Sequence, residues 1–222
     1  MANVLKGLRK IKPLEVEIII VDDGSTDGSH HYLKAIHNPP HLNVIFKELN
    51  SGKGSAIKEG FHQATGDYVL IQDADMEYDP MEYESLLKPV MDGSCKVVFG
   101  SRFKGKIDKM NPLNRIANIF LTTFTNLLYK SNFSDVCTAY KMFPKIFYKN
   151  VGCKSKGFEI CHELVAEVSN GHWPLIEVPI KYEARTYKEG KKVTWTQLFK
   201  SALTVILFRK KCTVFYDETN VI

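Results

Sequence analysis

Three acidic side chains, Asp73, Asp75 and Glu77, directly follow an apolar run of strand-forming residues at 68–72. In an extended backbone alternate side chains point to the same side, so the three carboxylates are predicted to face one region at the carboxyl end of a strand. Oxygen ligands of this kind suit a hard divalent cation such as Mg²⁺ or Mn²⁺. The acids alone are also compatible with a turn that keeps the strand end soluble, so the neighbouring elements must decide.

A second polar loop follows another apolar run. Residues 16–21 read VEIIIV, the pattern of a strand buried on both faces, and DDGSTDG follows at 22–28. Ser25, Thr26 or Asp27 can cap a helix that is predicted to run to about residue 37. An aspartate of the same loop can also bind a ribose or a base, and the pattern leaves both roles open.

Strands and helices alternate along the first hundred residues. Further strands are predicted at 43–47 and 97–99, and helices at 4–12 and 55–64. This order predicts an α/β fold with a mostly parallel sheet, right-handed crossovers and flanking helices. Open α/β sheets bind their ligands at the carboxyl ends of the strands, where the acids lie and where Arg102 follows the strand at 97–99.

The composition describes one domain without a disulfide framework or a structural zinc site. The chain has 222 residues, of which 44% are hydrophobic, and no shift in composition marks a linker. Residues 1–211 are expected to form the domain and residues 212–222 a C-terminal tail. Five cysteines without CxxC spacing favour a reducing compartment. Neither a secretory signal nor an apolar run of the ~20 residues needed to cross a bilayer is visible.

Basic charge gathers toward the end of the chain. Nine Lys or Arg and two Glu lie between Lys181 and Lys211, within a total net charge of +5. A solvated surface, a phosphate-binding loop and attraction to anionic lipid headgroups each explain such a cluster. Nucleic acid is disfavoured as a partner, because no helix-turn-helix or stacking-rich pattern accompanies the charge.

Two amphipathic stretches are predicted to form helices. Residues 195–208 are followed by the basic triplet RKK at 209–211, which suits anionic headgroups. Residues 113–129 are too polar to span a bilayer, and their apolar stripe can pack on the core, lie on a membrane surface or close over a lipid tail. That stripe consists of Ile116, Ile119, Phe120, Phe124, Leu127 and Leu128.

Several blocks in a fixed order resemble family 2 glycosyltransferases of the GT-A fold, close to the polyprenol-phosphate (dolichol-phosphate) mannose and glucose synthases. The blocks are VDDGSTDGS, NSGKGSAIKEGFHQATGDYVLIQDADMEYDP, VVFGSR, DVCTAYK, FEICHE, EVPI and RTYKEGKK. A lone DxD is a weak signal, whereas this ordered set is specific and spans about residues 14–208. The resemblance implies a Rossmann-like, mostly parallel sheet flanked by helices.

The resemblance also implies roles for the matching residues. Asp22 would order its loop, and Asp23 would contact the nucleoside of a donor such as GDP-mannose or UDP-glucose. Asp75 and Glu77 would hold Mg²⁺ or Mn²⁺ on the donor diphosphate. The implied catalytic residues are Asp75, Arg102 and Asp135. The implied substrate contacts are Val21, Asp23, Asp73, Ala74, Asp75, Glu77, Arg102, Arg115, Arg185 and Lys191.

Three of these contacts are expected to bind phosphates. Arg115 would face the acceptor phosphate from the start of its helix. Arg185 and Lys191, with Lys192 as the alternative to Lys191, would clamp the donor phosphates from a loop that closes and excludes water.

The implied reaction is the inverting transfer of mannose or glucose to a polyprenyl or dolichyl phosphate, at the cytosolic face of the endoplasmic reticulum or plasma membrane. A phosphate acceptor is already an anion near neutral pH and needs no general base. A hydroxyl acceptor would need one, and Asp135 is the candidate, although its position equally suits helix capping or ordering of an acceptor loop.

The chain departs from the family pattern at its start. Relatives begin with a strand that ends in Pro-x-Tyr/Phe-Asn-Glu and helps to hold the base, and this sequence begins after it. Loss of an inner parallel strand is expected to expose two sheet edges. The explanations left open are an incomplete sequence, a partner subunit that supplies the strand, and a defective donor site in a sugar-nucleotide-binding or scaffold protein.

Overall fold

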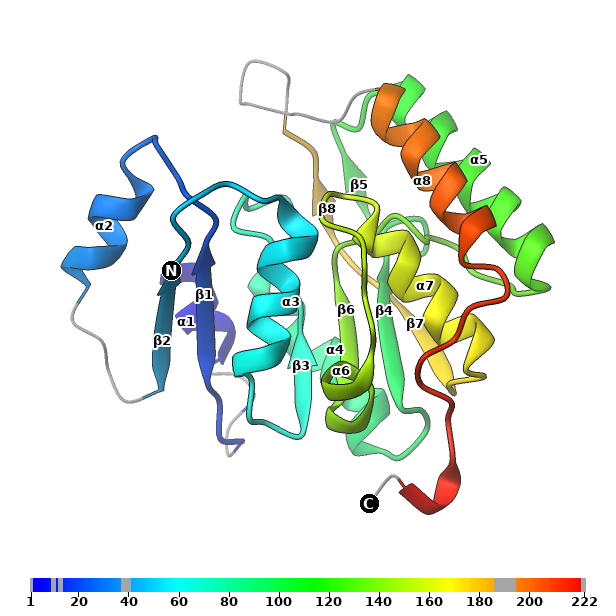
Figure 1. Ribbon diagram of the computed structural model, residues 1–222, viewed down its shortest axis with the longest axis horizontal. Coiled ribbons are helices and arrows are strands. Elements are labelled where there is room, and N and C mark those ends of the chain that lie inside the picture. Colours follow the sequence, from blue (N-terminus) through cyan, green and yellow to red (C-terminus); the bar gives the residue numbers. More distant parts are fainter. Residues whose placement is uncertain (1, 9–10, 12–13, 37–40, 186–194, 221–222) are drawn as a thin grey trace.

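The computed structural model describes residues 2–8, 11, 14–36, 41–185 and 195–220 (Figure 1). Its first half alternates strands and helices as predicted from the sequence. The elements are α1 (Ala2–Leu8), β1 (Ile18–Asp22), α2 (Ser29–Ala35), β2 (Leu42–Phe46), α3 (Lys53–Gln63) and β3 (Tyr68–Leu70).

The second half adds the remaining strands and the longest helices. The elements are the short 3-10 helix η2 (Pro80–Glu82), α4 (Tyr83–Met91), β4 (Val97–Ser101), β5 (Ile107–Asp108), α5 (Pro112–Tyr129), β6 (Lys141–Pro144), α6 (Lys145–Asn150), α7 (Ile160–Asn170), β7 (Leu175–Pro179), β8 (Tyr182–Glu183), α8 (Trp195–Leu207) and the 3-10 helix η4 (Glu218–Asn220).

The strands form a mostly parallel α/β arrangement, which confirms the predicted fold class. The central sheet has the order β3-β6-β4-β7, with β4 parallel to β7 and with β6 antiparallel to both β3 and β4. β1 pairs in parallel with β2, and β5 with β8. The antiparallel strand β6 was not expected, and it is the element that joins β3 to β4.

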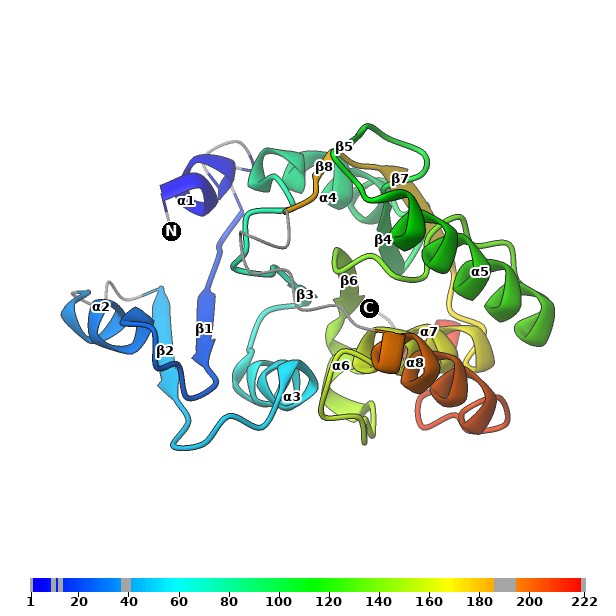
Figure 2. The same cartoon turned by 90° about the horizontal axis from the view of Figure 1, so that it is seen from above.

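The sheet is interrupted between β1 and β3, and Figures 1 and 2 show no strand between them. Within the described residues each of these two strands therefore has one unpaired edge, as expected for a missing inner strand. The aliphatic run of β1, Ile18–Val21, is only half-buried, although such runs are typical of strands covered on both faces. The interruption explains why this run is not shielded completely.

A side chain bridges the interruption near the beginning of β1. The carboxylate of Glu17, just before β1, accepts hydrogen bonds from the backbone N–H groups of Thr65 and Gly66 at 2.6 and 2.7 Å. It also accepts a bond from the Thr65 hydroxyl at 3.1 Å. Helix α3 packs on β1 as well. The β1–β2 pair is thus attached to the central sheet by side chains and by a helix.

Helices cover both faces of the central sheet (Figure 2). On one face α1 and α4 pack on β3 and β4 around Tyr83, Leu86 and Val98. On the other, α3, α6 and α7 pack around Phe99 and a stacked aromatic pair, Phe143 and Phe147. These buried layers fix the carboxyl ends of β3 and β4 relative to each other.

The residues predicted as a tail lie against this core. Val214 is buried, its carbonyl accepts a 2.9 Å hydrogen bond from the indole of Trp173, and the Tyr216 ring contacts Trp173 edge-on. Glu167, buried on α7, accepts bonds from the N–H and the hydroxyl of Thr213. Residues 213–216 therefore pack as part of the domain.

The apolar stripe of α5 faces mainly outward. The side chains of Ile116, Ile119, Phe120 and Leu127 are exposed, whereas Leu121, Thr122 and Thr125 form the buried face of the helix. Helix α8 lies beside α5, and the Tyr129 hydroxyl donates a 2.7 Å hydrogen bond to the carbonyl of Val205 (Figure 1). Packing on the core therefore does not account for these four exposed side chains.

Candidate functional site

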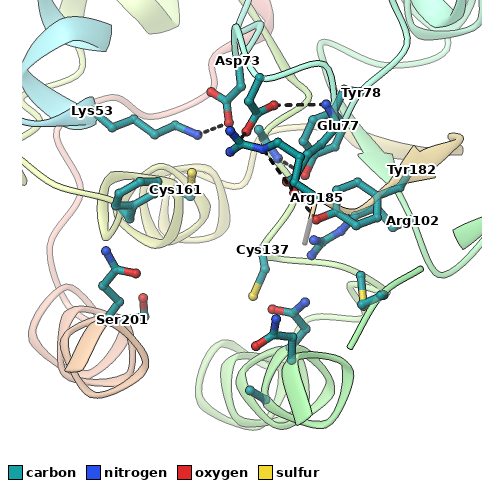
Figure 3. A pocket seen from close by; sticks show the side chains of 18 of the residues that line it. Lys53, Asp73, Glu77, Tyr78, Arg102, Cys137, Cys161, Tyr182, Arg185 and Ser201 are labelled. Atoms are coloured by element: carbon teal, nitrogen blue, oxygen red, sulfur yellow. Dashed lines mark hydrogen bonds and ion pairs between the residues drawn. The ribbon is translucent and has the colours of Figure 1, made fainter. Parts of the chain in front are cut away.

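A cavity of about 610 Å³ opens where β3 and β4 end, between these strand ends and the helices α5, α7 and α8 (Figure 3). Six residues predicted from the sequence line it: Asp73, Ala74, Asp75, Glu77, Arg102 and Arg185. The structure therefore gathers most of the predicted site from three separate segments of the chain.

The three acids converge through a turn, and the predicted extended alternation was wrong. β3 ends at Leu70, and residues 74–77 turn back with Met76 at φ 66°, a left-handed conformation that is uncommon outside glycine. Backbone strain of this kind clusters at functional sites, where surrounding contacts must maintain it. The Met76 side chain is exposed, and its backbone directs Asp75 and Glu77 toward the same cavity.

Lys53 was not predicted, and it forms the cationic side of the site. Its Nζ lies 2.6 Å from Asp73 Oδ2, and both residues line the cavity. Gly52, with φ 95°, and Gly54 let the start of α3 approach the carbonyls of Lys156 and Ser155, which a Cβ would meet at 2.6 and 2.5 Å. The sequence signal that could have identified Lys53 is its position between two glycines at the start of a helix.

Asp75 and Glu77 share one cationic neighbour, Arg185, which follows β8. Arg185 Nη2 lies 2.8 Å from Asp75 Oδ2, and its backbone N–H donates to Glu77 Oε1 at 2.9 Å. Tyr182 donates its hydroxyl to Glu77 Oε2 at 2.9 Å. Burial, followed by the neighbouring charge of Asp73, raises the pKa of Asp75. The site thus concentrates negative charge that attracts a cation.

Arg102 forms a buried bidentate ion pair with Asp135. Nε lies 2.6 Å from Oδ2 and Nη2 lies 2.8 Å from Oδ1, and the guanidinium also stacks 5.0 Å from the centre of the Tyr182 ring. Burial alone would lower the pKa of Arg102. The charge of Asp135 and its hydrogen bonds act in the opposite direction, and the net effect is a pKa above the ordinary value. Asp135 does not line the cavity; it holds the arginine that does.

The loop that carries Asp135 is ordered by Glu177 of the EVPI block. The Glu177 carboxylate accepts hydrogen bonds from the backbone N–H groups of Ser134 and Asp135 and from the Ser134 hydroxyl. Glu163 of the FEICHE block is likewise buried, and it accepts the N–H groups of Lys154 and Ser155 at 2.7 Å. Neither acid lines the cavity, and each holds the backbone of a loop.

Neutral groups form the inner wall of the cavity. Burial and then Lys141 lower the pKa of His162 to about 3, so this imidazole is uncharged at neutral pH. Its Nε2 lies 3.6 Å from the sulfur of Cys137, whose own pKa burial raises to about 12. These groups add polarity to the cavity without adding charge.

Three predicted contacts among the described residues do not line this cavity. Asp22 orders its loop as expected, since its carboxylate accepts the Ser25 N–H at 3.0 Å and lies 2.8 Å from His30 Nδ1. Asp23 accepts the N–H groups of Ser51 and Gly52, so it joins the end of β1 to the start of α3. Val21, Asp23 and Arg115 are not among the lining residues, and Lys191 lies outside the described residues.

The donor set fits a divalent cation that also binds phosphate. In the described part of the chain, no three His, Cys, Asp or Glu side chains gather as a complete metal site. Mg²⁺ is commonly held by only one or two carboxylates together with substrate phosphates. Asp75 and Glu77 provide two such carboxylates, and Lys53 and Arg185 provide charge for the remaining phosphate oxygens.

Comparison with known proteins gives a consistent result. Residues 1–152 match the model of the family described as "Glycosyl transferase family 2". The chain is 31% identical over 170 residues to the low-salt glycan biosynthesis hexosyltransferase Agl6 of Haloferax volcanii, covering 75% of this chain and 40% of Agl6. It is 30% identical over 208 residues to the uncharacterized protein MJ0544 of Methanocaldococcus jannaschii, covering 86% and 89%. The chain thus spans less than half the length of Agl6.

A solved structure shows the same fold. Glucosyl-3-phosphoglycerate synthase from Mycobacterium tuberculosis, in complex with Mn²⁺, UDP and phosphoglyceric acid, superposes with a TM-score of 0.68 at 16% identity. The match covers 97% of this chain and 74% of the synthase. At this identity the likeness shows the fold, which is of the GT-A type predicted from the sequence.

Proposed function

The chain belongs to glycosyltransferase family 2, and we propose that it transfers a hexose, with inversion, from a nucleotide sugar to a polyprenyl phosphate. One observation carries the proposal. Asp73, Asp75 and Glu77 meet Lys53 and Arg185 around a single cavity at the carboxyl ends of β3 and β4. Such a site suits a sugar nucleotide, whose diphosphate needs cations and whose hexose needs an enclosed space.

Asp75 and Glu77 would hold Mg²⁺ or Mn²⁺, since their carboxylate oxygens are the ligands that these ions prefer. A bound divalent cation would supply a Lewis acid that neutralises charge on the departing nucleoside diphosphate. The solved synthase that shares this fold contains Mn²⁺ together with UDP, which supports the same class of cofactor here.

The protein's own residues would position the reacting groups. Lys53 and Arg185 lie beside the acids and would contact donor phosphates, while Asp135 holds Arg102 rigidly at the cavity wall. In the transfer, an acceptor oxygen bonds to the anomeric carbon as the bond from that carbon to the phosphate oxygen breaks. The electron pair leaves with the nucleoside diphosphate. Fixed positive groups near that oxygen stabilise the developing charge.

The surroundings of Asp135 support an acceptor that is already an anion. Its two carboxylate oxygens accept four hydrogen bonds, three from Arg102 and one from the backbone N–H of Cys137. Both oxygens of this carboxylate are occupied by these bonds, and Asp135 does not line the cavity, so it is poorly placed to take a proton from an acceptor hydroxyl. A phosphate acceptor needs no such base, whereas the hydroxyl-acceptor alternative does.

The outer faces of α5 and α8 support action at a membrane surface. Beyond the α5 stripe, Phe199, Leu203, Ile206 and Leu207 of α8 are exposed, and the basic residues Arg209, Lys210 and Lys211 follow them. Apolar side chains flanked by Lys and Arg are typical of helices that lie in the plane of an anionic leaflet. No helix among the described residues has the length and hydropathy to cross a bilayer.

The two helices that carry these exposed apolar side chains, α5 and α8, also border the cavity. Leu113, Ala117 and Leu121 of α5 and Leu198 and Ser201 of α8 line the cavity, so the same two helices border both the site and the apolar surface. A polyprenyl phosphate docked there would place its phosphate near the carboxylates and its chain toward the lipid. We place the enzyme at the cytosolic leaflet, where the five free cysteines would stay reduced.

A donor panel tests the proposal. The purified chain is incubated with UDP-glucose or GDP-mannose, Mn²⁺ and a short polyprenyl phosphate, and products are followed by mass spectrometry. We expect a lipid-linked hexose phosphate from one donor and none after chelation of the metal. Transfer to 3-phosphoglycerate but not to the lipid, or to a hydroxyl acceptor only, would contradict the proposed acceptor.

A further inference from the structure

The guanidinium of Arg185 lies between the two carboxylates that we assign to the metal (Figure 3). Nη2 is 2.8 Å from Asp75 Oδ2, and Nε is 3.7 Å from Glu77 Oε1 and has no hydrogen-bond partner. These side chains are about one third, one fifth and one tenth exposed. A divalent cation bound by Asp75 and Glu77 would need the same oxygens that the guanidinium contacts now.

We propose that Arg185 is a built-in competitor of the metal, so that metal and nucleotide enter the site together and not in succession. This inference rests on the proposed function. When a metal-bound diphosphate arrives, its negative oxygens offer the guanidinium a new partner as the metal takes Asp75 and Glu77. The planar fork of a guanidinium matches both carboxylate and phosphate, so the diphosphate can replace the carboxylates as its partner.

The backbone around Arg185 is anchored independently of its side chain. The N–H of Arg185 donates to Glu77 Oε1 at 2.9 Å, that of Glu183 donates to the Glu77 carbonyl at 3.0 Å, and that of Ala184 donates to the Asp108 carbonyl at 3.0 Å. The side chain can therefore leave the carboxylates while its Cα stays in place. A rotation of one side chain is sufficient for the exchange.

The other contacts of these acids are compatible with a metal. Glu77 Oε2 accepts the neutral hydroxyl of Tyr182, and Asp75 Oδ1 accepts the N–H of Glu77 at 3.2 Å. Asp73 is already paired with Lys53. Among the described residues, Arg185 is thus a cation whose removal should change the affinity of Asp75 and Glu77 for a metal alone.

The test measures Mn²⁺ binding to the full chain from the electron paramagnetic resonance signal of free Mn²⁺, first without nucleotide and then with UDP or GDP. For Arg185→Gln we expect Mn²⁺ alone to bind about tenfold more tightly, because a partly exposed ion pair no longer competes. We expect the same variant to bind Mn²⁺ with nucleotide about tenfold less tightly, because the diphosphate loses a cation.

Two further variants locate the effect. Lys106→Gln removes a surface lysine that lies 3.5 Å from Asp108, outside the cavity, and should change neither affinity. Asp75→Asn combined with Arg185→Gln should lose the gain in metal affinity. Unfolding midpoints of all variants confirm that they are folded.

Opposite changes in the two affinities support the exchange. If Arg185→Gln leaves binding of Mn²⁺ alone unchanged or weakens it, Arg185 does not compete with the metal and the inference is wrong. The metal-only measurement is independent of any donor or acceptor. A gain in metal affinity without hexose transfer to lipid would therefore retain the inference and reject the proposed acceptor.

Discussion

Arg102 and Asp135, 33 positions apart in sequence, form a bidentate ion pair that is almost completely buried, with N–O distances of 2.6 and 2.8 Å. The backbone N–H of Arg102 also donates to Asp135, at 3.1 Å. The pair links the end of β4 to the loop before β6 and presents the arginine at the cavity. In our interpretation Asp135 therefore positions the guanidinium of Arg102. The competing interpretation is that Asp135 accepts a proton during the reaction.

Substitution of Asp135 separates these roles. We expect Asp135→Asn to lower the free energy of unfolding by about 3–5 kcal/mol, because the buried guanidinium loses its counter-ion. Replacing both partners, as Arg102→Met with Asp135→Leu, should restore much of that stability but no activity. Urea denaturation measures the first effect. An Asp135→Asn variant that keeps its stability and loses only the acidic limb of its pH–rate profile would identify Asp135 as the base.

Substitution of Asp75 tests the metal site. We expect Asp75→Asn to weaken Mn²⁺-dependent donor binding by roughly 100-fold, or about 2.7 kcal/mol, because one of two carboxylate ligands is lost. Titration calorimetry with a nucleoside diphosphate, with and without Mn²⁺, measures this. Asp79→Asn is a matched control, since Asp79 caps η2 through the N–H of Met81 at 3.0 Å and does not line the cavity. Undiminished metal dependence in Asp75→Asn would exclude the assignment.

The outer face of α5 can be tested apart from its core face. Ile116→Ser with Phe120→Ser should reduce binding to anionic vesicles by about tenfold or more, since burial of each apolar side chain contributes about 1.5–3 kcal/mol. Leu121→Ala, on the buried face, should instead lower the free energy of unfolding by about 2–5 kcal/mol. Vesicle flotation and denaturation measure the two effects. Equal flotation of the double variant and the unmodified chain would argue against this docking face.

His162 should make the protein less stable in acid. Its pKa is about 3 in the folded chain against an ordinary value of 6.5, so between these values the unfolded chain binds the extra proton and stability falls as pH falls. From pH 7 to pH 5 this histidine alone should cost about 2 kcal/mol. We expect His162→Gln to lose correspondingly less stability over that interval, measured by urea denaturation at both values. Identical losses would show that His162 is not held neutral.

Local patterns predicted most of the elements, because apolar periodicity acts over short distances. The cap of α2 is an exception, since Gly28 and not Ser25, Thr26 or Asp27 occupies that position. The run at β1, the acids after β3 and the stripe of α5 each carry a clear signal within a few residues. The antiparallel placement of β6 carries none, since pairing with β3 and β4 depends on contacts between distant segments. The fold class could therefore be predicted, while the strand order could not.

For the candidate site, too, some features could be predicted from the sequence and others could not. Residue types after the strand ends pointed to Asp73, Asp75, Glu77 and Arg102, the family resemblance added Arg185, and all five line one cavity. The partners of these residues were not predictable, because each pair joins segments far apart in the chain. Lys53 with Asp73 and Arg102 with Asp135 are such pairs, and the turn at Met76 replaces the extended geometry that alternation had suggested.

We expect the interruption between β1 and β3 to leave the protein with parts of unequal local stability. Backbone pairing holds β4 on both sides, whereas within the described residues β1 pairs only with β2 and meets the rest through Glu17, Asp23 and helix α3. We expect β1, α2 and β2 to open as a unit before the central sheet does, and their amides to exchange hydrogen faster than those of β4. A donor that contacts the loop after β1 would then bind partly by closing this unit, and would protect those amides from exchange far from the metal.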